Sequence, residues 1–257
     1  MIRAILGILS GFVSGVTGGA FGVGGAIVTT PAAQILMGAS PIVAVGSTLP
    51  VILPTTVAGA RAYRLAEQVD WRAVKWAVPP GLLAAAGGAA LTRIVNPTWL
   101  LLATAVLIGW QAYRVGVGRS PRDSPGHPVR PSHLALILTG TGAGFASGLL
   151  GIGGGVVLVP VMGGILHMPL KRSIGTSLVI IAFMVVPGTL VHALLGHIDW
   201  TISLWLSLGV IPGAIIGSRW TLRTRERTLR LVVAVFLTLV AAAYGAKEIH
   251  DLIAGVH

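Results

Sequence analysis

The sequence contains no cysteine and has few charged residues. The absence of cysteine excludes disulfides, thiolate metal sites, iron–sulfur clusters and cysteine nucleophiles. Charged residues make up only 10% of the chain, against about a quarter in an ordinary soluble domain. Because 54% of the residues are hydrophobic and the mean hydropathy is +0.88, the chain has too little polar surface to cover a soluble globule. We therefore predict an all-helical protein that crosses a lipid bilayer several times.

Acidic residues are scarcer than basic ones: there are 7 Asp and Glu against 18 Lys and Arg, giving a formal net charge of +11. Nucleic acid is not the expected partner, because the basic residues fall between apolar runs and are not interleaved with exposed aromatic residues. The sequence has no P-loop, no dinucleotide-binding glycine motif, no helical HxxxH metal pair and no Ser-His-Asp arrangement. No carboxylate lies in the interior of a predicted span. We therefore expect no enzymatic activity, no cofactor, no metal and no nucleic-acid partner.

Two copies of one pattern make up the chain, separated by 129 positions. The shift lays GGAFGVGGAIVTTP (18–31) over SGLLGIGGGVVLVP (147–160), with the glycines and the terminal proline in register. It also lays the Asp-Trp pair at 70–71 over the pair at 199–200. A single alignment offset that pairs so many residues over this length is not expected by chance. The chain therefore divides into a first transmembrane repeat, a cytoplasmic linker and a second transmembrane repeat, at residues 1–115, 116–131 and 132–257.

Each repeat is predicted to begin with a broken helical hairpin, built from two short apolar pieces on either side of the glycine cluster. A helix of about 14 residues is only ~21 Å long, too short for a hydrocarbon core of ~30 Å, so a re-entrant hairpin fits better than a single span. The short pieces are residues 4–17 and 26–37, and residues 132–147 and 155–167. Three full spans follow in each repeat, at 42–63, 72–93 and 98–115, and at 173–194, 200–220 and 229–248.

The distribution of Lys and Arg predicts the orientation of these spans. If each hairpin returns to its starting side, each repeat crosses the membrane three times, and the second repeat has inverted topology. With both termini outside, most basic residues then lie on the inner side, as the positive-inside rule requires. These residues are Arg61, Arg64, Arg72, Lys75, Lys171, Arg172, Arg219, Arg223, Arg225, Arg227 and Arg230, together with those of the linker. The opening MIRAILGILSG has a counterpart in the second repeat, so we expect it to be retained and not removed as a signal peptide.

The two glycine clusters are the main candidates for a binding site. Unwound backbone at membrane depth is tolerated only inside protein or beside a water-filled cavity. Glycine adopts positive φ angles and leaves its N–H group unshielded, and helices that start near Ala26 and Gly155 direct their positive ends at the hairpin tips. In inverted repeats the tips meet near the midplane, where secondary transporters bind substrate. We predict that an oxyanion binds the backbone of Gly24, Gly25, Gly153, Gly154 and Gly155.

The alternative is that the glycines serve only close helix packing. That interpretation is favoured for the glycines at four-residue spacing, which are Gly7, Gly11, Gly15, Gly19, Gly140, Gly144 and Gly148. It is less adequate for the tight clusters, because consecutive glycines destabilise a helix by about 1 kcal/mol each relative to alanine.

A pair of hydroxyl residues follows a glycine in the third element of each repeat. The pairs are Ser47 and Thr48, and Thr176 and Ser177, and they are in register. Hydroxyl groups can donate to an oxyanion without adding charge, so we predict that these four residues contact the substrate. The alternative, which the sequence leaves open, is that they bond to carbonyls of their own helices.

His192 is an ionisable residue well inside a predicted span, and Tyr63 is its counterpart in the first repeat. An intramembrane ionisable residue is a functional candidate, so we predict that His192 couples protons to transport or binds the anion when protonated. The alternative is a structural one, in which a histidine near a helix end reaches the membrane interface. Asp70 and Asp199 are predicted to be helix N-caps.

The duplicated openings and the Asp-Trp pairs resemble those of the TauE/SafE sulfite exporter family. The second copy, GFASGLLGIGGGVVLVP, resembles the GxxSGxxGxGGG-like family signature closely, whereas the first has Ala26 in place of the third glycine. The resemblance covers nearly the whole chain. It implies export, and in some members uptake, of small sulfur oxyanions or organosulfonates across the prokaryotic cytoplasmic (inner) membrane.

The sequence therefore predicts a secondary transporter, an exporter of small sulfur-containing anions such as sulfite, thiosulfate or organosulfonates, that works by alternating access around a midplane anion site. Two alternatives stay open: a non-transporting membrane scaffold or assembly protein, and a passive anion channel. The expected partners are the anion and the lipid bilayer. A homodimer is compatible with the sequence, which does not fix the oligomeric state.

Overall fold

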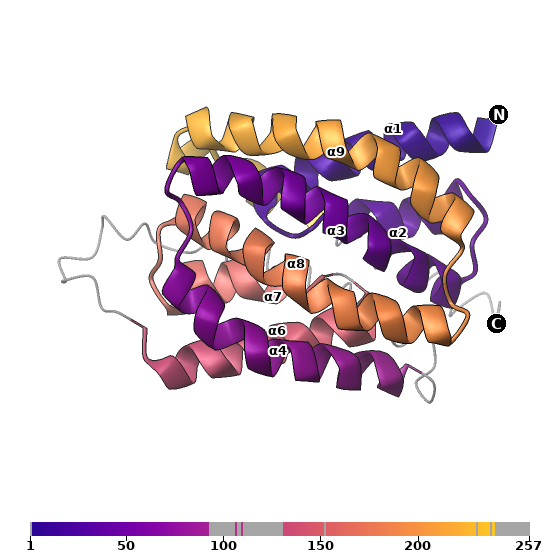
Figure 1. Cartoon of the computed structure of the whole chain (residues 1–257). Coiled ribbons are helices and arrows are strands. Elements are labelled where there is room, and N and C mark those ends of the chain that lie inside the picture. Colours follow the sequence, from indigo (N-terminus) through magenta and orange to yellow (C-terminus); the bar gives the residue numbers. More distant parts are fainter. Residues whose placement is uncertain are drawn as a thin grey trace.

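The computed structural model describes residues 2–92, 106, 109, 131–151, 153–229, 231–236 and 238–239. All regular elements within these residues are helical, as predicted from the composition (Figure 1). They are α1 (Ile2–Phe21), α2 (Ala26–Ile35), α3 (Pro41–Leu65), α4 (Trp71–Leu91), α6 (His133–Leu150), α7 (Gly155–Pro160), the π-helical turn η2 (Val161–Ile165), α8 (Leu170–Leu194) and α9 (Trp200–Arg223). The predicted spans at 98–115 and 229–248 and the predicted linker at 116–131 fall largely outside the described residues.

Five of these helices, α1, α3, α6, α8 and α9, are long and apolar enough to cross a membrane. The helices α3, α4, α8 and α9 lie where full spans were predicted. Two of them begin at an aspartate: Oδ1 of Asp70 and Oδ1 of Asp199 each accept hydrogen bonds from the N–H groups two and three residues further on. These bonds satisfy N–H groups that would otherwise have no partner in the first turn, so both N-cap predictions are confirmed.

The first helix of each repeat is longer than predicted. The pieces expected at 4–17 and 132–147 are helices of 20 and 18 residues, or about 30 and 27 Å, long enough to span a membrane. The expectation that neither could span was therefore wrong. The helices continue through their glycines because packing outweighs the low helix propensity of glycine: a Cβ on Gly19, for example, would lie 2.4 Å from the carbonyl oxygen of Ala214 in α9.

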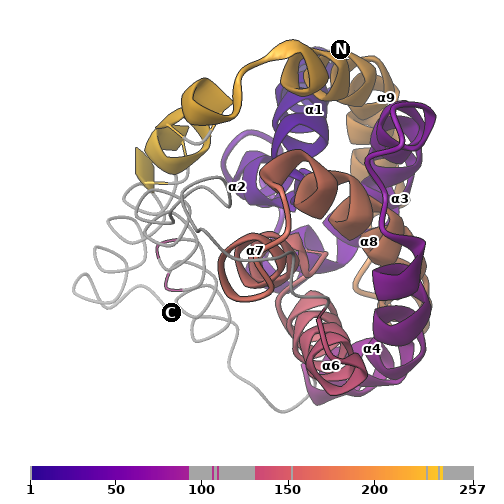
Figure 2. The ribbon, with the colours of Figure 1, turned by 90° about the vertical axis from the view of Figure 1, so that its left-hand side faces the viewer.

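The two repeats are interlocked. Helix α1 of the first repeat packs along α9 of the second, and α6 of the second packs along α4 of the first. Seen end-on, these two pairs lie at opposite sides of the bundle, with α8 between them (Figure 2). Each repeat therefore completes its packing with helices of the other.

Equivalent helices of the two repeats run in opposite directions along the bundle (Figure 1). The central pair, α3 and α8, shows this through its contacts. Gly46, near the start of α3, lies against the carbonyl group of His197 beyond the end of α8, and Gly175, near the start of α8, lies against the carbonyl group of Gln68 beyond the end of α3. Inverted repeats require this relation between their helices.

Glycines spaced four residues apart bring the paired helices into backbone contact. A Cβ on Gly140, Gly144 or Gly148 of α6 would collide with carbonyl oxygens of α4, and one on Gly11 or Gly15 would collide with those of α9. The packing interpretation of this glycine series therefore fits the structure, as small residues are what allow helix backbones in membranes to approach closely.

Candidate functional site

Two glycine turns interrupt the helical hairpins. The first turn, residues 22–25, joins α1 to α2, and the second turn, residues 151–154, joins α6 to α7. Both contain three glycines with positive φ angles at equivalent positions: Gly22, Gly24 and Gly25 at 71°, 77° and 86°, and Gly151, Gly153 and Gly154 at 67°, 75° and 73°. Residues with a side chain rarely adopt this conformation, which explains the shared glycine pattern.

The two turns meet at the centre of the helix bundle. A Cβ on Gly24 would lie 2.9 Å from Cγ2 of Ile52, and one on Gly153 would lie 3.2 Å from both Ile52 and Ile181. These isoleucines are equivalent in the two repeats and lie near the middle of α3 and α8. A Cβ on Gly155 would lie only 2.5 Å from the carbonyl oxygen of Gly22. The predicted meeting of the hairpin tips is therefore a feature of the fold.

The turns present backbone donors at this centre. Among the described residues, the N–H groups of Gly24, Gly25, Gly153, Gly154 and Gly155 donate no backbone hydrogen bond. Successive N–H groups in a turn form a concave surface that favours an anion. The backbone at both turns can thus bind an oxyanion, although that role of the five glycines stays a prediction.

Two of the four predicted hydroxyl residues contact the turns, each from the opposite repeat. Ser177 Oγ donates a hydrogen bond to the carbonyl of Gly22 at 2.8 Å, and Thr48 Oγ1 lies 3.5 Å from the carbonyl of Gly151. Each hydroxyl also lies within hydrogen-bond distance of a carbonyl in the preceding turn of its own helix, which shares its single proton, so the back-bonding alternative also fits them. Both residues are fully buried. Their hydroxyls help to hold the turns in place.

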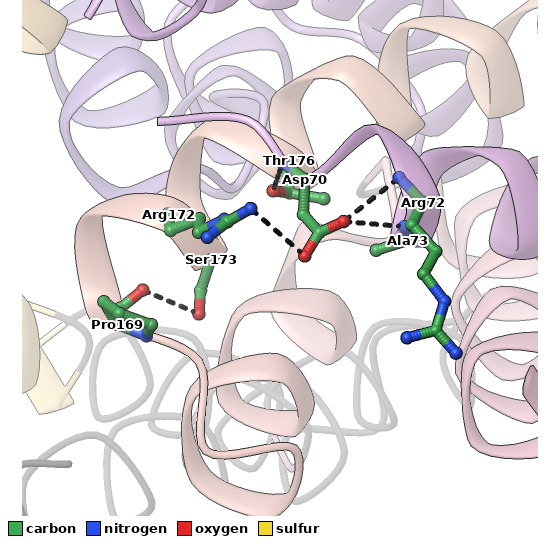
Figure 3. Close-up of polar contacts among 7 residues, drawn as sticks. All are labelled: Asp70, Arg72, Ala73, Pro169, Arg172, Ser173 and Thr176. Carbon is green, nitrogen blue, oxygen red and sulfur yellow. Dashed lines mark hydrogen bonds and ion pairs between the residues drawn. The ribbon is translucent and has the colours of Figure 1, made fainter. Parts of the chain in front are cut away.

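The other two hydroxyl residues fix a loop of the opposite repeat. Ser47 Oγ accepts a hydrogen bond from the N–H of Asp199 at 2.8 Å, and Thr176 Oγ1 accepts one from the N–H of Asp70 at 2.9 Å. Figure 3 shows the second of these contacts, together with the Asp70 carboxylate 3.5 Å from the guanidinium of Arg172. These bonds give Ser47 and Thr176 a structural part in this conformation, and their contact with substrate stays a prediction.

His192 lies inside the protein and is fully buried, which argues against the alternative that its side chain reaches out to the interface. Its Nε2 lies 3.4 Å from the carbonyl oxygen of Gly148, and its Nδ1 lies 3.3 Å from Nδ1 of His197. In the first repeat the hydroxyl of Tyr63 donates to the carbonyl of Gly19 at 3.0 Å. The equivalent residues thus bind equivalent carbonyls, but only the second repeat has an imidazole at this place.

Sequence reasoning overlooked three groups at this centre: Ser14, Ser147 and the isoleucine pair. Ser14 Oγ donates to the carbonyl of Gly25 at 2.6 Å, across the first hairpin. Ile52 and Ile181 are 129 positions apart, so the register of the duplication could have identified them.

In the part of the chain that the structure describes, there is no cluster of three or more His, Asp or Glu residues that could hold a metal ion.

A duplicated helical membrane protein whose two broken hairpins meet at its centre has the architecture of a membrane transporter. Residues 7–244 match the protein family described as "Sulfite exporter TauE/SafE", so the chain belongs to the TauE/SafE family. It is a membrane transporter that crosses the bilayer several times.

Similar proteins support this conclusion. The chain is 26% identical to the "Probable membrane transporter protein YunE" of Bacillus subtilis, over 91% of this chain and 94% of that protein. It is 29% identical to a "Probable membrane transporter protein" of Xylella fastidiosa (strain Temecula1), over 82% and 81%. It is 22% identical to the "Probable membrane transporter protein MJ0441" of Methanocaldococcus jannaschii, over 90% and 91%. No solved structure matches the chain significantly.

Proposed function

We propose that this transporter moves small sulfur-containing anions, such as sulfite, thiosulfate or organosulfonates, and that it is a secondary exporter. The observation that carries the proposal is the meeting of two glycine turns in which the N–H groups of the five predicted glycines donate no backbone hydrogen bond among the described residues. A small oxyanion has several acceptor oxygens and can bind such N–H groups without a charged side chain. The family description supports the sulfur chemistry.

The basic residues support a topology with inverted repeats and both termini outside, in a prokaryotic inner membrane. The ends of α3 and α9 and the starts of α4 and α8 lie at the same end of the bundle (Figure 1). Lys171 Nζ donates to the carbonyl of Leu222 at 2.8 Å and so joins two of these ends. This end carries Arg61, Arg64, Arg72, Lys75, Lys171, Arg172, Arg219 and Arg223. By the positive-inside rule we place it on the cytoplasmic side.

Alternating access would be needed to load the site. Thr48 and Ser177 and the isoleucine pair are fully buried in this conformation, so an anion cannot reach the turns from either end without helix movement. A rearrangement of the helices around the turns would open the site to one side of the membrane at a time. The backbone N–H groups then supply the binding surface in both conformations.

Saturable flux in a purified system is the direct test. Proteoliposomes containing the protein are expected to take up radiolabelled sulfite or thiosulfate with a measurable KM, whereas protein-free liposomes do not. Substrate in the opposite compartment should accelerate uptake by exchange, which a passive channel does not show. Absence of flux for sulfite, thiosulfate and an organosulfonate would contradict the proposal and favour the scaffold alternative.

Proton coupling through His192 has its own expected result. A pH gradient of one unit supplies about 1.4 kcal/mol per coupled proton, enough for about tenfold anion accumulation in wild-type proteoliposomes. His192→Gln keeps an N–H that can donate to the Gly148 carbonyl but cannot titrate. This variant is therefore expected to exchange anion normally and to show no accumulation driven by the gradient. Equal accumulation in variant and wild type would show that His192 does not couple protons.

A further inference from the structure

The two glycine turns differ in how firmly they are held, although their backbones match. The first turn is held by short bonds: Ser14 Oγ donates to Gly25 at 2.6 Å, and Ser177 Oγ donates to Gly22 at 2.8 Å. Thr221 Oγ1 adds a bond at 3.0 Å to the carbonyl of Ala20, two residues before the turn begins. The first turn is thus fixed by hydroxyl groups on three helices.

The second turn lacks the strongest of these bonds. Ala143 stands at the position equivalent to Ser14 and has no hydroxyl, so the bond across the hairpin is missing. The contact equivalent to that of Ser177 is the one from Thr48 to Gly151, and at 3.5 Å it is at the limit of a hydrogen bond. The second turn is therefore held more loosely than the first.

A buried hydroxyl without a partner lies beside the second turn. Ser147 is fully buried, and its Oγ has no hydrogen-bond partner among the described residues. Its Cβ lies 3.4 Å from the position that a Cβ on Gly154 would occupy, so the side chain faces the turn. Thr139 and Thr141 in the same helix donate to the carbonyl four residues earlier, but Ser147 does not. An unsatisfied buried hydroxyl is unfavourable and therefore calls for an explanation.

We propose that Ser147 is a substrate-binding residue and that the second turn binds the anion, whereas the first turn is a rigid support. The Ser147 hydroxyl donates to an oxygen of the anion, beside the N–H groups of Gly153 and Gly154. In the first repeat the equivalent of Ser147 is Gly18, where a Cβ would lie 2.7 Å from the backbone nitrogen of Gly25. A serine does not fit there, so the two halves cannot share this role. The inference rests on the proposed anion transport.

Ser147→Ala and Ser14→Ala test the difference between the turns, since each removes one buried hydroxyl from equivalent hairpins. Ser147→Ala is expected to raise the KM for sulfite by about tenfold, because it removes one hydrogen bond to a charged ligand. In detergent without anion, the melting temperature of Ser147→Ala should equal or exceed that of the wild type. The Ser147 hydroxyl makes no hydrogen bond among the described residues, so its removal leaves no other group there without a partner. Ser14→Ala should lower the melting temperature and leave the KM unchanged.

The outcomes separate this inference from the proposed function. Saturable wild-type flux with an unchanged KM in Ser147→Ala contradicts the inference alone, and so does an equal rise in KM in Ser14→Ala. A lower melting temperature with an unchanged KM in Ser147→Ala would show a purely structural role for this serine. Absence of wild-type flux, together with no thermal stabilisation by sulfite, contradicts the proposed function, and the inference falls with it.

Discussion

Replacing Gly144 with leucine is expected to prevent stable folding, whereas the same change at Gly142 leaves the protein folded. A Cβ on Gly144 would clash with the carbonyl group of Gly81, and only a separation of α6 from α4 would remove this clash. Forcing two packed backbones apart is expected to cost about 3 kcal/mol or more. Size-exclusion chromatography and thermal unfolding in detergent measure the result. Gly144→Leu should be aggregated or absent from the membrane.

Gly142 provides the matched control because it lies in the same helix and is also a glycine. A Cβ there would meet nothing within 4 Å, and the residue is exposed. Gly142→Leu should therefore give a monodisperse peak with a melting temperature close to that of the wild type. If both leucine variants fold equally well, α4 and α6 do not pack as the structure shows.

Gly153→Ala is expected to reduce flux to a tenth of the wild-type value or less while the protein still folds. The added methyl group would lie 3.2 Å from Ile52 and from Ile181, side chains that can shift by a few tenths of an ångström. It would also shield the N–H groups that the anion needs, and loss of one hydrogen bond to a charged ligand corresponds to about 1.5–3 kcal/mol. Gly154 is less suitable, since a Cβ there would lie 2.5 Å from the Ala143 carbonyl oxygen.

Gly196→Ala controls for backbone strain in this experiment. Gly196 has a φ of 70°, close to the 75° of Gly153, but a Cβ on it would meet nothing within 4 Å. Alanine in this conformation costs roughly 1–2 kcal/mol at either position. Both variants should lose similar thermal stability, and only Gly153→Ala should lose flux. Wild-type flux in Gly153→Ala would remove the second turn from the binding site.

The sequence predicted the helices and the meeting of the two turns because these depend on local patterns repeated in register. It could not predict that Ser47 and Thr48 act at different places, one on the loop before α9 and the other on a glycine turn. Adjacent residues on a helix point about 100° apart, and which neighbour each meets depends on the packing. Whether His192 is buried was left open for the same reason, since its burial requires α6 to lie against α8.

The extension of α1 to Phe21 shows a different limit. The first helical piece was predicted to end at residue 17, just before Gly18 and Gly19. In the fold they are sites of close contact, with Gly18 against Gly25 of the hairpin and Gly19 against Ala214 of α9. Whether a glycine ends a helix or lets it pack closely is decided by the partner surface, which for Gly19 belongs to the other repeat.

The crossed pairing of α1 with α9 and of α4 with α6 has a consequence for how such a transporter moves. Helices whose backbones touch at successive glycines cannot slide or tilt apart without losing the whole contact. Each of these two tightly packed helix pairs therefore contains one helix from each repeat. For the proposed alternating access we therefore expect the hinges to lie within each half, in the connections between its hairpin and its later helices, and not at the boundary between the two repeats.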